Sequence, residues 1–123
     1  MQLTENFSLS EFDCNDGSKT PQSVIDQLEK VADNLQVLRK YLGKSIQVNS
    51  GYRSPSYNVK IGGASKSQHV LGNAADIVVE GYTPKQVFDV IELLQERGEM
   101  SVGGLHAYKT FVHYDIRGHF ARW

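Results

Sequence analysis

The chain has 123 residues, of which 13 are Lys or Arg and 14 are Asp or Glu, so its formal net charge is −1. A chain of this length can fold as one domain that buries about two-thirds of the surface exposed by the unfolded chain. The near-neutral charge argues against a general nucleic-acid binder, because such proteins usually carry a clear basic excess. We therefore expect one domain over residues 1–123 and no nucleic-acid partner.

The sequence also argues against a disulfide-rich protein, a membrane-spanning protein and a protein with a signal peptide. Cys14 is the single cysteine, so no framework of intrachain disulfides can form. No apolar run approaches the ~20 residues that a transmembrane helix needs, and residues 1–7 lack the basic-then-apolar order of a signal peptide. We expect a monomer that is made in the cytoplasm and does not insert into a membrane.

The first part of the chain predicts an irregular opening, a long helix and a short strand. Phe7 and Phe12 should pin the opening segment onto the core. Thr20-Pro21 supplies an N-cap and a first helical residue. Apolar residues then recur at spacings of three and four up to Gly43, which is a natural stop. Residues 45–50 alternate in the manner of a short strand.

A long polar loop and a buried strand follow. Residues 51–72 are polar and rich in Gly and Ser, and structureless loops of this length are uncommon unless they have a function. Residues 75–79 predict a buried strand that opens with a carboxylate. Thr83 and Gln86 match the capping box of a second helix, which should end near Gly98.

The last quarter predicts two strands, over residues 102–108 and 111–116. Because successive side chains of a strand point to opposite faces, His113 and Asp115 share one face of the second strand. Two helices beside several short strands, without strict alternation, indicate an α+β fold. We expect a mainly antiparallel sheet that is flanked by the two main helices.

His69, Asp76 and His113 are the candidate metal ligands. His69 lies in the polar loop, Asp76 follows at the start of a strand, and His113 projects from a later strand. Two histidines and one carboxylate around zinc leave an open position for water, which is the arrangement of a catalytic zinc site. From the residues alone the alternative is a loop histidine, a carboxylate that caps a strand and a satisfied, half-buried histidine.

Two motifs favour the metal hypothesis. Residues 67–76 fit S-x-H-x-x-G-x-A-x-D, and residues 111–115 fit F-V-H-x-D. Both motifs resemble the zinc D-alanyl-D-alanine carboxypeptidase family, whose fold is shared with the vancomycin-resistance dipeptidases and the hedgehog signalling domain. The similarity extends in matching order over nearly the whole chain, from residue 6 to residue 123.

The resemblance implies that His69, Asp76 and His113 bind Zn²⁺. It also implies a peptidase that hydrolyses peptidoglycan stem peptides next to a D-amino acid, of either the carboxypeptidase or the endopeptidase type. By the same resemblance Arg53 holds a substrate carboxylate or carbonyl oxygen, for which a planar guanidinium is suited, and Ser67 hydrogen-bonds the substrate. The alternatives are a turn arginine and a serine that only shapes the loop.

One position departs from the dipeptidase pattern. That branch carries a glutamate general base three residues before its last histidine ligand, where this chain has Thr110. Asp115 is the candidate catalytic base, and its alternative role is to orient His113. His106 is either a catalytic donor to the oxyanion or a half-exposed strand histidine. The missing glutamate supports a second interpretation, a catalytically inactive zinc-containing module that serves binding or structure.

The sequence outside the candidate site suggests, by analogy, a phage origin. A bare domain without a signal peptide or a wall-binding repeat resembles phage lysins, which a holin releases or a virion carries. We therefore expect an enzyme that acts on the cell wall, with a phage lysin as one such case.

Overall fold

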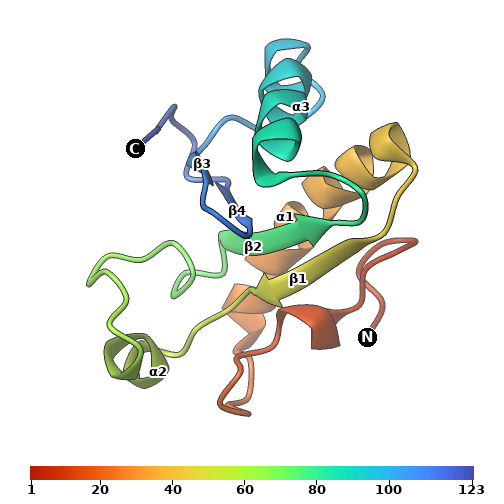
Figure 1. The fold of residues 1–123 in the computed structure, drawn as a ribbon. Coiled ribbons are helices and arrows are strands. Elements are labelled where there is room, and N and C mark those ends of the chain that lie inside the picture. Colours follow the sequence, from red (N-terminus) through yellow and green to blue (C-terminus); the bar gives the residue numbers. More distant parts are fainter.

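A four-stranded antiparallel sheet organises the fold, with the strands in the order β1-β2-β4-β3 (Figure 1). The computed structural model describes residues 1–123. The strands are β1 (Ile46–Ser50), β2 (Ala74–Val79), β3 (Leu105–Ala107) and β4 (Val112–Asp115). The helices are α1 (Gln22–Leu42), α2 (Pro55–Lys60), α3 (Pro84–Glu96) and a short 3-10 helix at Leu9–Phe12. This arrangement confirms the predicted α+β class.

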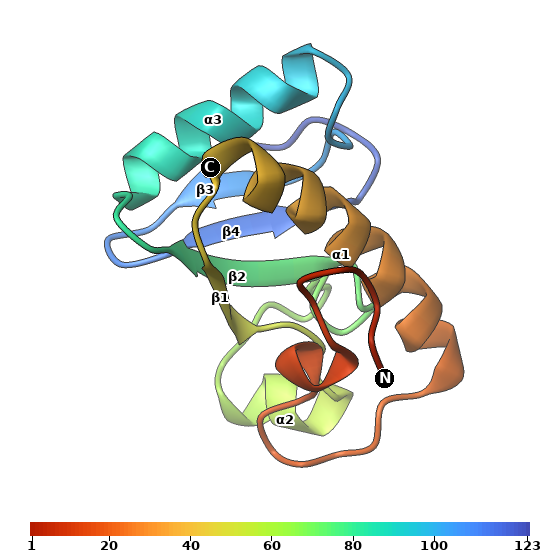
Figure 2. The ribbon, with the colours of Figure 1, turned by 90° about the vertical axis from the view of Figure 1, so that its right-hand side faces the viewer.

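Helices α1 and α3 pack against one face of the sheet (Figure 2). The apolar stripe of α1 is buried, as its spacing predicts. Across from it, alternate strand residues turn inward and form the sheet's share of the core. These inward residues are Ile77, Val79, Leu105, Val112 and Tyr114. The opposite face of β2 and β4 is therefore left for polar side chains.

The ends of the two long helices mostly follow their sequence signals. Gly43 ends α1 in the left-handed conformation, with φ of 66°, and the capping box of Thr83 and Gln86 begins α3. The start of α1 corrects the prediction by one residue. Pro21 is extended and forms the N-cap, because the Thr20 hydroxyl donates to Asp13 (2.9 Å) and does not cap the helix.

The long polar loop contains a helix that the sequence reading did not predict. Helix α2 begins after Ser54, whose hydroxyl accepts a hydrogen bond from the Tyr57 backbone N–H (3.2 Å). Pro55 occupies its first position, where a missing N–H costs nothing. This Ser-Pro pair is a helix-start signal, but the six-residue helix is too short to show an apolar period.

The opening segment is anchored as predicted. Phe7 and Phe12 are both fully buried in the core, and their ring centroids lie 6.1 Å apart. No helix of the structure combines the length and the apolar character that crossing a membrane requires.

Strand register decides which polar residues meet. In the β2–β4 ladder Asp76 lies opposite His113 and Ala74 lies opposite Asp115. In the β3–β4 ladder His106 lies opposite His113. Since directly opposed residues of an antiparallel pair project to the same face, Asp76 and His113 meet on the face that the helices leave open.

Candidate metal centre

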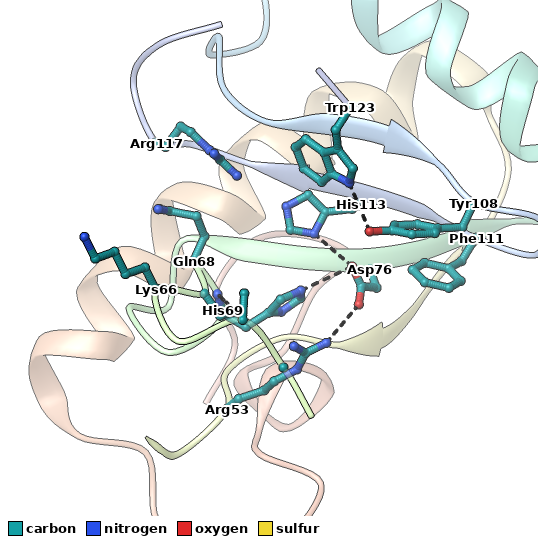
Figure 3. A pocket seen from close by; sticks show the side chains of 13 residues that line it. Arg53, Lys66, Gln68, His69, Asp76, Tyr108, Phe111, His113, Arg117 and Trp123 are labelled. Atoms are coloured by element: carbon teal, nitrogen blue, oxygen red, sulfur yellow. Dashed lines mark hydrogen bonds and ion pairs between the residues drawn. The ribbon is translucent and has the colours of Figure 1, made fainter. Parts of the chain in front are cut away.

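His69, Asp76 and His113 converge on one point of the open sheet face (Figure 3). Asp76 Oδ1 lies 3.2 Å from His69 Nε2 and 3.1 Å from His113 Nδ1. The three potential ligand atoms all lie within 4.8 Å of one another, and all three residues are buried. The structure thus brings together the predicted ligands from the loop after α2, from β2 and from β4.

Each histidine ring is oriented by a hydrogen bond that it makes through the nitrogen facing away from Asp76. His69 Nδ1 donates to the Gly51 carbonyl oxygen (2.8 Å), and His113 Nε2 donates to Asp115 Oδ2 (2.7 Å). In a neutral imidazole the other nitrogen then carries a lone pair. In that neutral state two lone pairs and a carboxylate oxygen face one another, which is a donor set that suits a metal cation. When the rings carry protons at these nitrogens, they hydrogen-bond Asp76 Oδ1 instead.

The electrostatics of the three residues agree with a cation site. Burial alone would raise the pKa of the Asp76 carboxyl, but hydrogen bonds with His113 and His69 outweigh it and hold that pKa well below its usual range. Burial also opposes a charge on His113, yet the hydrogen bonds with Asp115 and Asp76 raise its pKa. The site therefore stabilises positive charge beside an ionised carboxylate.

The donor set and its spacing fit zinc. Zinc binds imidazole nitrogen and carboxylate oxygen at about 2.0–2.2 Å, so neighbouring ligands of a tetrahedral ion lie about 3.3–3.6 Å apart. The distances from Asp76 Oδ1 to the two ring nitrogens, 3.2 and 3.1 Å, lie within about 0.2 Å of the lower end of that spacing. Three protein ligands would leave a bound zinc ion one further position for a water molecule.

Arg53 lies beside the ligand cluster. Its Nη2 donates to Asp76 Oδ2 (3.4 Å), and its Nε donates to the Ser50 hydroxyl (3.3 Å). The Arg53 backbone N–H donates to the His69 carbonyl oxygen (3.0 Å), which ties the arginine to the ligand loop. The guanidinium is half-buried and lines the cleft above the metal-binding cluster.

Asp115 lies on the far side of His113 from Asp76. It is fully buried and does not line the cleft. Its two oxygens accept hydrogen bonds from His113 Nε2, from the Gly104 backbone N–H (2.7 Å) and from the guanidinium of Arg117 (2.7 and 2.9 Å). These bonds lower the pKa of Asp115 although burial works against its charge. Such contacts favour the orienting role over the role of a base.

Of the two remaining candidate residues, Ser67 lies in the wall of the cleft and His106 lies outside it. Ser67 lines it, and the Ser67 hydroxyl accepts a hydrogen bond from the His69 backbone N–H (3.2 Å). His106 does not line it. The His106 ring stacks on Trp123 with 5.4 Å between ring centroids, and the Trp123 ring in turn meets the ring of His113 edge-on at 5.2 Å.

The ligand cluster forms part of the wall of an open cleft of about 540 Å³. Three cations line this cleft, Arg53, Lys66 and Arg117, and three aromatic rings face them. The sequence did not assign five of the wall residues to the site, namely Lys66, Gln68, Tyr108, Arg117 and Trp123. Phe111 was placed on the side of His113 by the alternation expected over residues 111–116.

Comparisons with known proteins agree with this geometry. A model of the family described as Peptidase M15 matches residues 5–115, which include all three candidate ligands. Over 44 residues the chain is 50% identical to the zinc D-Ala-D-Ala carboxypeptidase of Streptomyces albus G. That match covers 35% of this chain and 17% of the relative's length. Because the family model spans most of the chain, the chain belongs to the peptidase M15 family of zinc peptidases.

Proposed function

We propose that this zinc peptidase hydrolyses a peptide bond next to a D-amino acid in the stem peptides of peptidoglycan. In this proposal His69, Asp76 and His113 hold the zinc ion, and Arg53 and Ser67 bind the substrate. The Streptomyces albus G relative, a D-Ala-D-Ala carboxypeptidase by name, supports the substrate class. The role of a phage lysin stays a prediction by analogy.

The observation that carries the proposal is the position of Arg53 beside the ligand cluster. A guanidinium 3.4 Å from Asp76 Oδ2, within an open cleft, can hold a substrate carboxylate or carbonyl oxygen next to the metal-binding residues. Lys66 and Arg117 add positive charge along the same cleft. A peptide that ends in a D-alanine carboxylate supplies the matching negative charge.

In this proposal the residues of the site have separate roles in binding the metal, aligning the substrate and positioning the ligands. Zinc, when bound, polarises a water molecule and a substrate carbonyl group. Arg53 aligns the substrate, and the turn made by Ser67 places the His69 ring. Asp115 holds the ring of His113 in one orientation and one tautomer. Since Asp115 is fully buried and already accepts four or more hydrogen bonds, we assign it this positioning role and not proton transfer.

Mass spectrometry of digested stem peptides tests the proposal. Zinc-loaded protein is incubated with a pentapeptide that ends in D-Ala-D-Ala, with its L-Ala-L-Ala diastereomer, and with cross-linked peptides. We expect cleavage next to the D-residue, none of the diastereomer, and none by His113→Ala. Release of one D-alanine indicates a carboxypeptidase, and cleavage of the cross-link indicates an endopeptidase. If wild type leaves all of these peptides intact at saturating zinc, the inactive-module interpretation replaces the enzyme.

A further inference from the structure

The hydroxyl of Tyr108 lies at the edge of the cleft and is held by the indole of Trp123. Trp123 Nε1 donates to Tyr108 Oη with a distance of 3.1 Å. Both side chains line the cleft together with the three candidate metal ligands. Figure 3 shows the hydroxyl directed from the aromatic side of the cleft toward Asp76 and His113.

The rings around Tyr108 hold its hydroxyl in place. The Tyr108 ring stacks on Phe111 with 4.6 Å between centroids and an interplanar angle of 19°, and it meets His106 edge-on at 4.4 Å. Trp123 is itself held between His106 and His113. These ring contacts orient the phenol toward the cleft, while Tyr108 and Trp123 keep 39% and 53% of their surface exposed.

The bond from Trp123 also determines what the hydroxyl can offer. An indole nitrogen only donates, so Tyr108 Oη accepts in this bond and keeps its own proton for another partner. The contact with Trp123 is the one hydrogen bond that the Tyr108 hydroxyl makes within the chain. The free O–H thus belongs to a group that is oriented by the fold and faces the cleft.

The other candidate donors do not occupy this place. Thr110 and His106 do not line the cleft, and Asp115 is fully buried and does not line it either. Arg53 lies at the other side of the ligand cluster, where it bonds Asp76. A substrate carbonyl that reaches the metal centre would therefore have Arg53 on one side and the Tyr108 hydroxyl on the other.

We propose that Tyr108 is a catalytic residue that donates a hydrogen bond to the oxygen of the scissile carbonyl, and that Trp123 is its positioning residue. This inference rests on the proposed peptidase function. Negative charge on that oxygen grows as the carbonyl carbon becomes tetrahedral, so a donor already in place stabilises the transition state more than the bound substrate. Tyr108 keeps its proton throughout.

A double-mutant cycle on the zinc-loaded enzyme tests this assignment. Tyr108→Phe keeps the ring and removes the hydroxyl, so kcat should fall about 10²-fold with KM and zinc content nearly unchanged. Trp123→Phe keeps a ring but removes the N–H, and kcat should fall about threefold to tenfold. In the Tyr108→Phe background the Trp123→Phe change should have no further effect on kcat, because its acceptor is gone. Tyr41→Phe, at an exposed tyrosine on α1, is the matched control.

Binding of a phosphinate analogue of D-Ala-D-Ala provides a readout that does not depend on turnover. Its tetrahedral phosphinate resembles the transition state, so Tyr108→Phe should weaken its Kd by a factor similar to the loss of kcat and leave the Kd of D-alanine unchanged. Wild-type kcat in Tyr108→Phe, or an unchanged phosphinate Kd, would overturn the assignment. If wild type cleaves no stem peptide, the proposed function fails. The ratio of the phosphinate Kd of Tyr108→Phe to that of wild type still tests the role of Tyr108. A wild type that does not bind the phosphinate overturns both.

Discussion

Side chains of the metal centre are oriented by groups that the metal would never touch. The Gly51 carbonyl group holds His69, and Asp115 holds His113. The three candidate ligands could be predicted, because two short motifs contain them at fixed spacing. Tyr108 and Trp123 were not, since their hydrogen bond joins residues 15 positions apart without any local pattern.

Replacement of Arg53 by lysine tests its role in substrate binding. Lysine keeps the charge but loses the planar fork that bonds Asp76 and Ser50 in the structure. We expect zinc content to stay and kcat/KM to fall by about one to three decades, which is roughly 1.4–4 kcal/mol of transition-state binding. Steady-state kinetics on a D-Ala-D-Ala peptide measure this. An unchanged kcat/KM would remove Arg53 from the substrate site.

The variant Asp115→Asn separates the two roles considered for this residue. If Asp115 orients His113, zinc affinity should weaken by about 10–100-fold, and excess zinc should restore most of the activity. If it were the general base, zinc would be retained and activity would fall about 10²–10⁴-fold without rescue. An activity assay across a zinc titration distinguishes them. The contacts of Asp115 predict rescue, and failure of saturating zinc to restore activity would contradict the positioning role.

Strand pairing brings together two candidate ligands, Asp76 and His113, that lie far apart in the sequence. The alternation of β4 correctly predicted that His113 and Asp115 share a face, and the carboxylate at the start of β2 was also evident. The order β1-β2-β4-β3 was not predictable, because the alternation within a strand does not determine which other strands it pairs with. Helix α2 was missed for a related reason, since six residues are too few for a helical period.

Gly104 connects the segment before β3 with the metal centre. Its N–H donates to Asp115 Oδ1 (2.7 Å), and a side chain at this position would collide with the Asp115 carboxylate. Gly104→Ala should therefore displace Asp115, loosen His113 and weaken zinc affinity by about 10–100-fold. Competition with a chromophoric chelator measures the affinity, and circular dichroism checks that the chain is folded. Wild-type affinity in a folded Gly104→Ala protein would show that Asp115 does not control the ligand.

At the scale of the whole molecule one hydrophobic core supports the open sheet face. Twenty-one buried residues from both long helices, the opening segment and all four strands form one cluster. The helical part of this cluster follows from the 3–4 spacing in α1. The cleft above the opposite face does not follow from the sequence, because its walls come from the loop between β1 and β2, from β2 and β4, from the turn between β3 and β4, and from the residues after β4.

Removal of zinc should lower the stability of the whole chain. Zinc binds the folded arrangement of His69, Asp76 and His113 and not the separated residues of the unfolded chain, so ligation adds to the free energy of unfolding. We expect EDTA to lower the Tm and one equivalent of zinc to restore it. Scanning calorimetry measures both. A Tm that is the same with and without chelator would argue against a metal site formed by folding.

The central claim is that His69, Asp76 and His113 together hold one zinc ion. Elemental analysis of the purified protein tests it most directly, with His69→Ala, Asp76→Ala and His113→Ala beside wild type and with exposed His119→Ala as the matched control. We predict about one zinc per chain in wild type and in His119→Ala, and far less than one in each of the other three variants. Full zinc occupancy in folded variants of the three ligands would contradict the claim.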